Sequence, residues 1–387
     1  MLAILAISIV DHGHTQNTVF NHGDLMMGNN YYSHSPIHIT SNVEFTPSNG
    51  VSEGSGTVDD PYIIKNWRIN ASTVHAIWIE NTDAYFMIRN CYAYGGGMDY
   101  GCIFLYNVQN GRVEHSTVTR SWYGIYLYSS SNNTLTNNTV YGNDGDGICL
   151  ELSSNNTLTD NAIYENNDGI ELDSLSHYNI VTNNTIYDNH IGVFLKSSSS
   201  NTLVNNTVYE NSWDGFRLWN SSSNILTANT IYGNSNNNGI GLFSSSNNRI
   251  TDNMVYGNDN GIYIISSSHN LIYHNKLINN TQNGYDETPA NNYWHHPILL
   301  EGNYWSDYNG LDDGSGVGKH SIAGDGIGDT LTPHPDSDYD DYPLTNSLVG
   351  DPNFSMLVFT HGLLVMSSLI IIGIAVYVVL KRKKPTS

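Results

Sequence analysis

The order of apolar and polar residues along the chain repeats with a fixed period. An aliphatic residue in the phrase N-x-(L/I/V) recurs at distances of 23, 23, 22, 23, 24 and 22 residues. Such a period is typical of a solenoid, whose stacked repeats bury a shared core. Less regular copies at Ile64, Ile88 and Val113 extend the array to about ten turns. The regular positions are Leu135, Leu158, Val181, Leu203, Leu226, Ile250 and Ile272.

Each repeat contains three short apolar segments separated by Asn, Gly, Asp or Ser. In one copy these segments are Leu135, then Val140, then Ile148 with Leu150. β-Branched and aromatic residues favour strands, whereas the separating residues favour turns. No copy has the apolar spacing of an amphipathic helix. The pattern predicts an all-β fold, a right-handed parallel β-helix with three strands in each coil.

Alternation along each strand predicts which side chains leave the core. In "GICL", Ile148 and Leu150 should face inward and Cys149 outward. Aromatic rings suit packing against sugar faces, so the outward rings are candidate glycan-binding residues. The alternative is that the tyrosines stack on one another and stabilise adjacent coils. One outward column is Tyr141, Tyr164, Tyr187, Tyr209, Tyr232 and Tyr256, and the other is Phe104, Tyr126, Cys149, Glu171, Phe194, Arg217, Gly241 and Tyr263.

Asparagines occupy two further repeat positions. Stacked amides can form hydrogen-bonded ladders, and Asn tolerates bend conformations. We therefore expect two ladders along the axis, the alternative being solvated turn residues. The two columns are Asn138, Asn161, Asn184, Asn206, Asn229, Asn253 and Asn275, and Asn143, Asn166, Asn189, Asn211, Asn234, Asn258 and Asn280.

The two ends of the chain indicate its location. Residues 356–380 form an apolar run long enough to cross a bilayer, and the basic tail 381–387 follows it. This order predicts one transmembrane helix with the large domain outside and the tail in the cytoplasm. Residues 1–10 resemble the apolar part of a signal peptide without its basic start. Between these ends we expect an irregular His-rich segment at 11–35, an N-terminal cap at 36–66, the β-helix at 67–300 and an Asp/Gly-rich C-terminal cap at 301–350.

Composition narrows the choice of partners. The formal charge is −22 with only 14 Lys and Arg residues, which disfavours nucleic acid as a partner. The three cysteines lack metal-type spacing, so we expect free thiols, with a Cys91–Cys102 disulfide as the alternative. N-x-S/T sequons outside the cell are candidate glycosylation sites. The candidates are Asn132, Asn137, Asn155, Asn183 and Asn205.

Three sequence features together resemble the NosD-type proteins. They are "SGTVDDPYIIKNWRIN" before the repeats, the coils themselves, and "GNYWSDY…GDGIGD…DYPL" after them. This family consists of right-handed β-helix proteins, also described as having carbohydrate-binding and sugar-hydrolysis repeats, and many archaeal surface proteins are similar. The resemblance covers about residues 36–345. It implies polysaccharide binding or cleavage, or copper delivery in the periplasm.

Two segments loosely resemble the Asp-bearing strands of β-helix polysaccharide hydrolases. In such enzymes one carboxyl protonates the leaving oxygen and another activates water. The segments "NDGDGICLEL" and "NNDGIELDS" lack the accompanying G-H-G and R-x-K phrases, and D-G-I is also the ordinary turn phrase of these repeats. Solvated turn carboxylates are therefore the alternative, and we do not expect an enzyme. The candidate catalytic residues are Asp144, Asp146, Asp168, Glu171, Asp173 and Arg217.

Two regions are candidate metal sites. Calcium prefers oxygen ligands from flexible loops, and the C-terminal cap is rich in aspartate. Its candidate calcium ligands are Asp312, Asp313, Asp325, Asp329, Asp336 and Asp338, with Asp340 and Asp341 beside them. Imidazole and thioether suit copper, but the N-terminal histidines lack regular spacing, so copper is not expected. Those residues are His12, His14, His22, His34 and His38, with Met26 and Met27.

These observations favour a membrane-anchored extracellular β-helix. We expect it to bind a polysaccharide or glycoprotein of the cell envelope, or to act as a structural or adhesion element. A polysaccharide hydrolase or lyase is the enzymatic alternative, and copper handling is the third.

Overall fold

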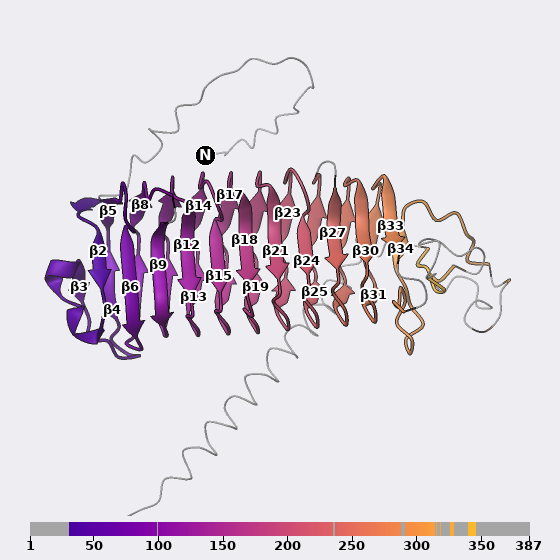
Figure 1. Ribbon diagram of the computed structural model, residues 1–387. Helices are drawn as coiled ribbons and strands as arrows, with labels where there is room; N and C mark the ends of the chain where they lie inside the picture. Colours follow the sequence, from indigo (N-terminus) through magenta and orange to yellow (C-terminus); the bar gives the residue numbers. More distant parts are fainter. Residues whose placement is uncertain are drawn as a thin grey trace, which may run out of the picture.

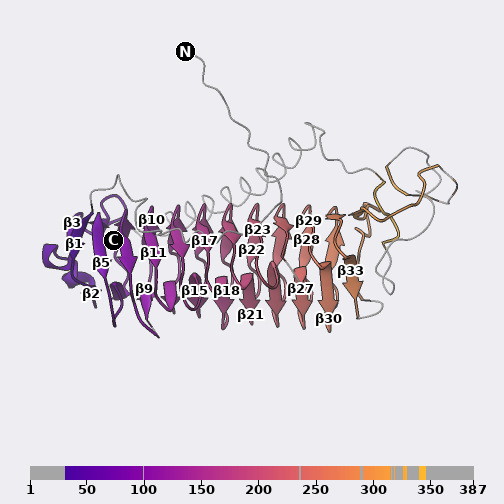
Figure 2. The same cartoon turned by 90° about the horizontal axis from the view of Figure 1, so that it is seen from above.

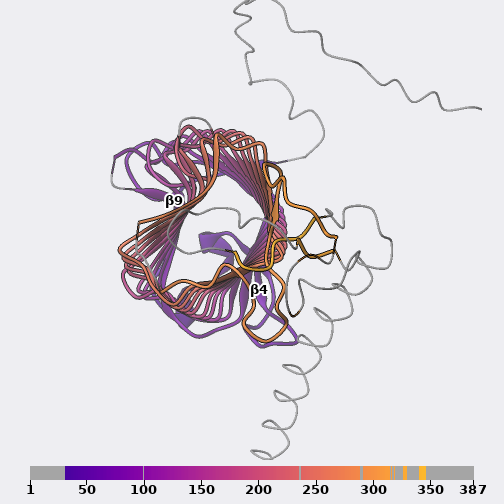
Figure 3. The same cartoon turned by 90° about the vertical axis from the view of Figure 1, so that its right-hand side faces the viewer.

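A computed structural model describes residues 31–98, 100–234, 237–287, 291–313, 315, 318, 326–328 and 340–345. The chain forms a rod of about ten coils, in which three parallel sheets run side by side along the axis (Figure 1). Viewed along the axis, successive coils superpose around one core (Figure 3). This arrangement confirms the right-handed parallel β-helix predicted from the repeats.

The strands of each sheet follow one another at intervals of one coil. The first sheet has twelve strands: β1 (Tyr32–His34), β5 (Trp67–Asn70), β8 (Tyr92–Tyr94), β11 (Thr117–Thr119), β14 (Thr139–Tyr141), β17 (Ala162–Tyr164), β20 (Thr185–Tyr187), β23 (Thr207–Tyr209), β26 (Thr230–Tyr232), β29 (Met254–Tyr256), β32 (Lys276–Ile278) and β34 (Tyr304–Trp305). The second has eleven: β3 (Val51–Glu53), β4 (Tyr62–Lys65), β7 (Phe86–Arg89), β10 (Gly111–Glu114), β13 (Thr134–Thr136), β16 (Thr157–Thr159), β19 (Ile180–Thr182), β22 (Thr202–Val204), β25 (Ile225–Thr227), β28 (Arg249–Thr251) and β31 (Leu271–Tyr273). The third also has eleven: β2 (Ile37–Ile39), β6 (Ile77–Thr82), β9 (Gly101–Val108), β12 (Tyr123–Tyr128), β15 (Ile148–Glu151), β18 (Asp168–Asp173), β21 (Ile191–Lys196), β24 (Phe216–Trp219), β27 (Asn238–Phe243), β30 (Asn260–Ile265) and β33 (Gln282–Asp286).

The strand register stacks the same repeat position of successive coils in the core. Leu135 pairs with Leu158, and Leu158 pairs with Val181, so identical repeat positions lie one above another. These aliphatic side chains are fully buried, as are Ile148 and Leu150. One coil exposes its apolar face, whereas the stack buries a continuous hydrophobic core. The alternation rule therefore assigned these inward residues correctly.

The N-terminal end of the rod departs from the regular coil. Two short 3₁₀ turns, η1 (Asn42–Glu44) and η2 (Pro47–Asn49), precede strand β3, which pairs antiparallel with β4. Phe45 stacks on Tyr62 with ring centroids 4.6 Å apart and is largely buried. This segment covers the first coil of the core, at the indigo end of the rod (Figures 1 and 2).

The cysteines correct one alternative from the sequence. Cys91, Cys102 and Cys149 are all free and buried, so the Cys91–Cys102 disulfide is not formed. Cys149 belongs to the outward column, yet it is only 3% exposed because neighbouring outward side chains cover it. Outward orientation therefore does not mean contact with solvent at this position.

Both predicted asparagine ladders are present. In the ladder through Asn206, the backbone N–H and Nδ2 of Asn184 both donate to Asn206 Oδ1 at 3.0 Å. Asn206 repeats this pattern toward Asn229 at 2.9 and 3.0 Å, and its Nδ2 also donates to the Val181 carbonyl. Each amide thus connects neighbouring coils and is fully buried. The alternative of solvated turn residues is excluded for these columns.

The structure also contains a third asparagine ladder and a column of serines, which the sequence analysis did not predict. The ladder includes the residues that follow the sequon asparagines Asn132 and Asn155, and Asn156 donates to Asn179 Oδ1 at 2.8 and 3.2 Å. In the serine column, the Ser153 N–H donates to Ser176 Oγ at 3.0 Å. The additional ladder is Asn133, Asn156, Asn179, Asn201, Asn224, Asn248, Asn270 and Asn292.

In all three ladders the bonds from one asparagine to the next run in one direction, toward the C-terminal end of the rod, and each ladder ends at an aspartate. Asn303 N–H donates to Asp340 Oδ2 at 2.7 Å, and Asn283 Nδ2 donates to Asp307 Oδ1 at 2.8 Å. The third ladder ends where Asn292 donates to Asp286. A row of aligned amides leaves its last donor without an acceptor, and a carboxylate is a strong acceptor for it. The C-terminal region thus supplies the groups that complete the ladders.

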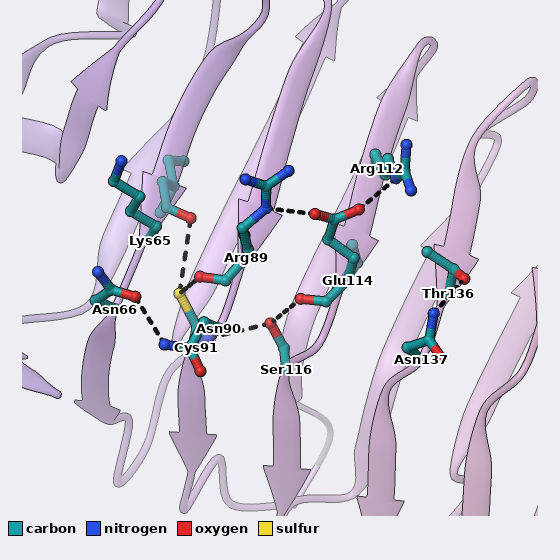
Figure 4. Close-up of polar contacts among 12 residues, drawn as sticks. Lys65, Asn66, Arg89, Asn90, Cys91, Arg112, Glu114, Ser116, Thr136 and Asn137 are labelled. Carbon is teal, nitrogen blue, oxygen red and sulfur yellow. Dashed lines mark hydrogen bonds and ion pairs between the residues drawn. The ribbon is translucent and has the colours of Figure 1, made fainter. Parts of the chain in front are cut away.

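The outer side of the second sheet carries a buried carboxylate between two arginines, in the coils that precede most of the asparagine ladders. The Glu114 side chain lies between Arg89 on β7 and Arg112 on its own strand (Figure 4). Arg112 Nε is 2.6 Å from Glu114 Oε2, and Arg89 Nε donates to Oε1. Two half-exposed guanidinium groups therefore hold a carboxylate whose side chain is only 4% exposed. Buried carboxylates need such partners.

No helix within the described residues has the length and hydrophobicity of a membrane span. The apolar run at 356–380, the basic tail and residues 1–10 lie outside those residues.

Candidate functional site

The outer face of the third sheet brings together most of the candidate residues. As predicted, the parallel register aligns one outward residue per coil in a single column. A second outward column follows two residues later on each strand. The first contains Phe104, Tyr126, Cys149, Glu171, Phe194, Arg217, Gly241 and Tyr263, and the second contains Tyr106, Tyr128, Glu151, Asp173, Lys196, Trp219 and Phe243.

A glycine bend at the start of these strands adds a third position to the face. A Cβ at Gly169 would lie 2.5 Å from the Gly192 carbonyl oxygen, so the coils can approach this closely only with glycine. The bend brings together the residue before the glycine and the residue two after it. Tyr123 and Tyr126 stack there with ring centroids 4.6 Å apart.

At this bend two adjacent coils carry acidic groups and a thiol. Asp146 and Cys149 come from one coil, and Asp168 and Glu171 come from the next. One carboxyl oxygen of Asp146, Cys149 Sγ and one carboxyl oxygen of Glu171 all lie within 4.8 Å of one another. Asp146 and Asp168 are each 6% exposed. We call these four residues the acidic cluster.

Burial changes the protonation chemistry of the acidic cluster. Desolvation, followed by the charge of Glu171, raises the pKa of Asp168 to about 7. The same two causes, in that order, raise the pKa of Asp146 well above its usual value. Burial and the neighbouring charges of Asp146 and Glu171 raise the pKa of the Cys149 thiol. Perturbed groups of this kind often mark functional sites.

Polar neighbours surround the acidic cluster on its outer side. Lys196 Nζ bonds Asp173 Oδ2 at 3.0 Å and lies 3.7 Å from Glu171 Oε1. His190 Nδ1 lies 3.9 Å from Asp168 Oδ1, too far for a hydrogen bond. Asp173 therefore forms an ion pair with Lys196, whereas Asp168 forms no close ion pair within the described part of the chain and has acidic neighbours.

One cation lies among aromatic rings two coils away. Arg217 Nη1 donates to the fully buried Asp214 carboxylate at 2.7 Å. Its guanidinium carbon is 4.4 Å from the Phe243 ring centroid, 5.0 Å from that of Trp213 and 5.4 Å from that of Trp219. The two tryptophans remain 37% and 45% exposed. The face thus presents solvent-exposed rings beside acidic and basic groups.

The six catalytic candidates divide into three sets. Asp146, Asp168 and Glu171 form the acidic cluster, with Asp173 beside them, and Arg217 lies two coils away. Asp144 is exposed on the turn before the bend and does not join them. Sequence reasoning placed Cys149 in the outward column of this face, but it missed Lys196, Asp214, Trp213 and Trp219. Aligning the residue before each D-G or Y-G glycine would have revealed the bend column.

The tyrosine column on the first sheet is a continuous stack. Neighbouring ring centroids from Tyr141 to Tyr256 are 4.8–5.0 Å apart, and the planes differ by 2–14°. The side chains lie outside the core and are partly exposed, as the alternation rule predicted. However, each ring in the middle of the column has both of its faces covered by the two neighbouring rings. Ring edges and hydroxyls, rather than faces, are presented to solvent.

The candidate metal residues are only partly described. Asp312 Oδ2 accepts from the Gly326 N–H at 2.8 Å, and Asp313 Oδ1 accepts from the Ser315 N–H at 2.9 Å. His34 packs against Trp67 on the first sheet, whereas His38 stacks on Trp78 on the third. The remaining calcium candidates, Asp325, Asp329, Asp336 and Asp338, and the copper candidates His12, His14, His22, Met26 and Met27 lie outside the described residues.

The five sequon asparagines share one conformation. All are exposed and have a φ between 53° and 59°, the left-handed region that Asn tolerates. The following residue is buried in each case. They are Asn132, Asn137, Asn155, Asn183 and Asn205.

Two family models match the sequence over overlapping parts of the rod. The family described as "Periplasmic copper-binding protein (NosD)" matches residues 173–310, and that described as "Right handed beta helix region" matches residues 30–186. No curated protein gives a significant match.

Solved structures share the fold at low sequence identity. The mannuronan C-5 epimerase AlgE6 A-module of Azotobacter vinelandii is 14% identical, with a TM-score of 0.47 over 60% of this chain and 86% of that chain. The periplasmic alginate epimerase AlgG is 17% identical, with a TM-score of 0.46 over 65% and 80%. An alginate lyase from Paenibacillus sp. str. FPU-7 is 11% identical, with a TM-score of 0.41 over 67% and 97%. These likenesses concern the fold alone.

The parallel coils and the family matches together define a right-handed parallel β-helix protein. Within that class the chain is similar to the NosD-type proteins, whose family model matches residues 173–310.

Proposed function

We propose that this protein binds a polysaccharide of the cell envelope along the outer face of the third sheet. The observation that carries the proposal is the pair of exposed tryptophans, Trp213 and Trp219, beside the charged residues of the same face. An exposed indole offers an apolar surface for a sugar ring. The adjacent Asp173–Lys196 pair offers a hydrogen-bond acceptor and a donor for sugar hydroxyls.

The third sheet suits a sugar better than the tyrosine column does. Rings in that column are nearly parallel at 4.8–5.0 Å, so their faces contact each other. Trp219 and Phe243 are instead tilted by 30° with centroids 6.2 Å apart, and Trp219 remains 45% exposed. In this proposal the tyrosines stabilise the coils and the tryptophans contact the ligand.

Charge favours a neutral polymer over a polyanionic one. The chain carries a formal charge of −22, and the two nearest cations of this face are already paired. Arg217 is bonded to Asp214, and Lys196 is bonded to Asp173. A polyanion would therefore meet net repulsion, whereas a neutral glycan would meet hydrogen-bonding groups and exposed rings.

The proposal places the rod outside the cytoplasm. The apolar run at 356–380 would anchor it, and the basic tail 381–387 would lie in the cytoplasm. Exposed sequons on the coil surface are consistent with this location. Protease added to intact cells should remove the rod and spare an epitope placed after Lys384, and protection of the rod would contradict the proposed orientation.

A second candidate function is polysaccharide cleavage by the same face. Two carboxyl groups in different environments are what acid–base cleavage requires. The pKa of Asp168 is raised to about 7 by burial and by Glu171, whereas Asp173 is bonded to Lys196. New reducing ends released from a bound polysaccharide, and lost in Asp168→Asn, would support cleavage.

A polysaccharide array tests the binding function directly. The full-length protein in detergent should bind neutral polymers and should bind uronic-acid and sulfated polymers more weakly. Binding confined to the polyanions would overturn the charge argument. No binding to any polymer by folded protein would overturn the proposed function itself.

A further inference from the structure

The acidic cluster differs from an ordinary patch of surface carboxylates because it contains a buried thiol. Asp146, Cys149 and Glu171 offer three ligand atoms within 4.8 Å of one another. They come from two adjacent coils, so the strand register fixes their relative position. Cys149 Sγ lies 3.9 Å from Glu171 Oε2. One sulfur and two oxygens are thus already gathered at one point of a rigid sheet.

A separate observation is that one buried carboxyl oxygen of this cluster has no hydrogen-bond partner among the described residues. Asp168 Oδ1 is buried and accepts no hydrogen bond, and its side chain is only 9% exposed. It occupies the bend column next to Asp146 in the following coil, on the same strand as Glu171. A buried carboxyl oxygen without a donor is costly. A cation beside Asp146 and Glu171 would satisfy it.

We infer that Asp146, Cys149 and Glu171 form a binding site for a zinc ion, with Asp168 supplying the fourth ligand. Zinc is bound by cysteine sulfur and by carboxylate oxygen, usually in sets of four. Calcium needs six to eight oxygen ligands, which a four-residue cluster containing sulfur does not provide. Zinc also tolerates the mixture of sulfur and oxygen donors better than cuprous copper, which prefers sulfur.

The surrounding charges are compatible with a bound dication. Lys196 approaches Glu171 Oε1 at 3.7 Å, but it bonds Asp173 more closely. His190 lies beside Asp168, and Tyr126 donates to Glu151 rather than to the cluster. Burial and the neighbouring acids raise the pKa of the Cys149 thiol, so zinc must displace the thiol proton. That proton is released to solvent, and zinc affinity should therefore increase with pH.

This inference is independent of the proposed glycan binding, because it concerns an ion and a different part of the face. It would place a dication two coils from Arg217 and from the exposed tryptophans beside that residue. A site held by two coils would also link them, so zinc should raise the thermal stability of the protein by preferential binding to the folded state.

Titration calorimetry of zinc chloride into the metal-free full-length protein tests the site. Wild type should bind one zinc ion, and Cys149→Ser should bind it more than about tenfold more weakly. Cys102→Ser is the matched control, since that thiol is also fully buried but bonds the Thr119 carbonyl inside the core. It should bind zinc like wild type.

Cobalt binding and a second variant distinguish loss of the metal site from loss of the fold. Cobalt bound to wild type should show thiolate-to-metal charge-transfer absorption, which Cys149→Ser should lack. Glu171→Gln, at a less buried position, should weaken zinc binding while circular dichroism shows intact strands. Equal zinc binding by wild type and Cys149→Ser, or no binding by folded wild type, would overturn the site. Tighter binding of calcium or cuprous copper than of zinc would overturn the assigned metal.

Discussion

Removing one amide from the middle of a ladder should strongly destabilise the rod. Asn206→Ala deletes four hydrogen bonds: two from Asn184 to Oδ1, and two from Nδ2 to Val181 O and Asn229 Oδ1. The Asn184 backbone N–H is then buried without a partner, which costs about 1–3 kcal/mol, and the other three bonds contribute about 1 kcal/mol each. We expect a total loss of about 4–6 kcal/mol of unfolding free energy.

Equilibrium unfolding in guanidinium chloride, followed by circular dichroism, measures this loss. The matched control is Asn205→Gly, at the adjacent exposed position with φ +55°. Glycine keeps that conformation, and the Asn205 side chain bonds only Asn183 at the surface, so the change should stay within about 1 kcal/mol. A loss below about 1 kcal/mol for Asn206→Ala would refute the reasoning, because water would then replace the amide without cost.

The near-isosteric change Asn206→Asp tests the direction of the ladder. The carboxylate still accepts from Asn184, but it cannot donate to Asn229 or Val181. Burial raises the pKa of such a group above its unfolded value. The variant should therefore be less stable at pH 8 than at pH 5, relative to wild type. The opposite pH dependence would mean that the amide is oriented the other way.

Three further changes probe the cap, the stack and the bend. Burial raises the pKa of Asp340 to about 7, above its unfolded value of 3.8, so the contribution of Asp340 to stability should increase as pH falls from about 8 to 5. Thermal melts of Asp340→Asn should lack this part of the pH dependence, and a variant with the pH profile of wild type would contradict the prediction. Replacing Tyr187 and Tyr209 by Ser breaks three ring stacks and should cost about 2–4 kcal/mol in denaturant unfolding; unchanged stability would show that the stack contributes nothing. Gly169→Ala should cost about 1–3 kcal/mol in the same assay, because its Cβ would meet a backbone oxygen at 2.5 Å, and a neutral effect would show that the coils can separate there.

Local sequence patterns predicted the coil well because each rule acts within one repeat. The 22–24-residue spacing and the alternation of side chains were sufficient to place Leu135, Val140 and Ile148 in the core. The same rule placed Tyr187 outside it. Stacking in register then follows, since identical positions in successive coils lie above one another.

Contacts between unlike positions could not be predicted in this way. Cys149 is covered because its neighbours in adjacent coils are large, which alternation along one strand does not reveal. The glycine bend joins residues on either side of Gly169, and it is visible only when coils are compared. Asp340 lies 37 residues beyond Asn303 in the sequence, in a segment without the repeat. Its role at the ladder end depends on the tertiary fold.

The most direct test of the account compares two faces of the same rod. Trp219→Ala and the double variant Tyr187→Ser with Tyr209→Ser should be titrated with a neutral polysaccharide that binds wild type, under conditions where every protein is folded. The account predicts that Trp219→Ala lowers affinity by about tenfold, equivalent to about 1.4 kcal/mol, with little change in stability. The tyrosine variant should bind normally. Full affinity in Trp219→Ala, together with lost affinity in the folded tyrosine variant, would place the ligand on the first sheet and contradict the central claim.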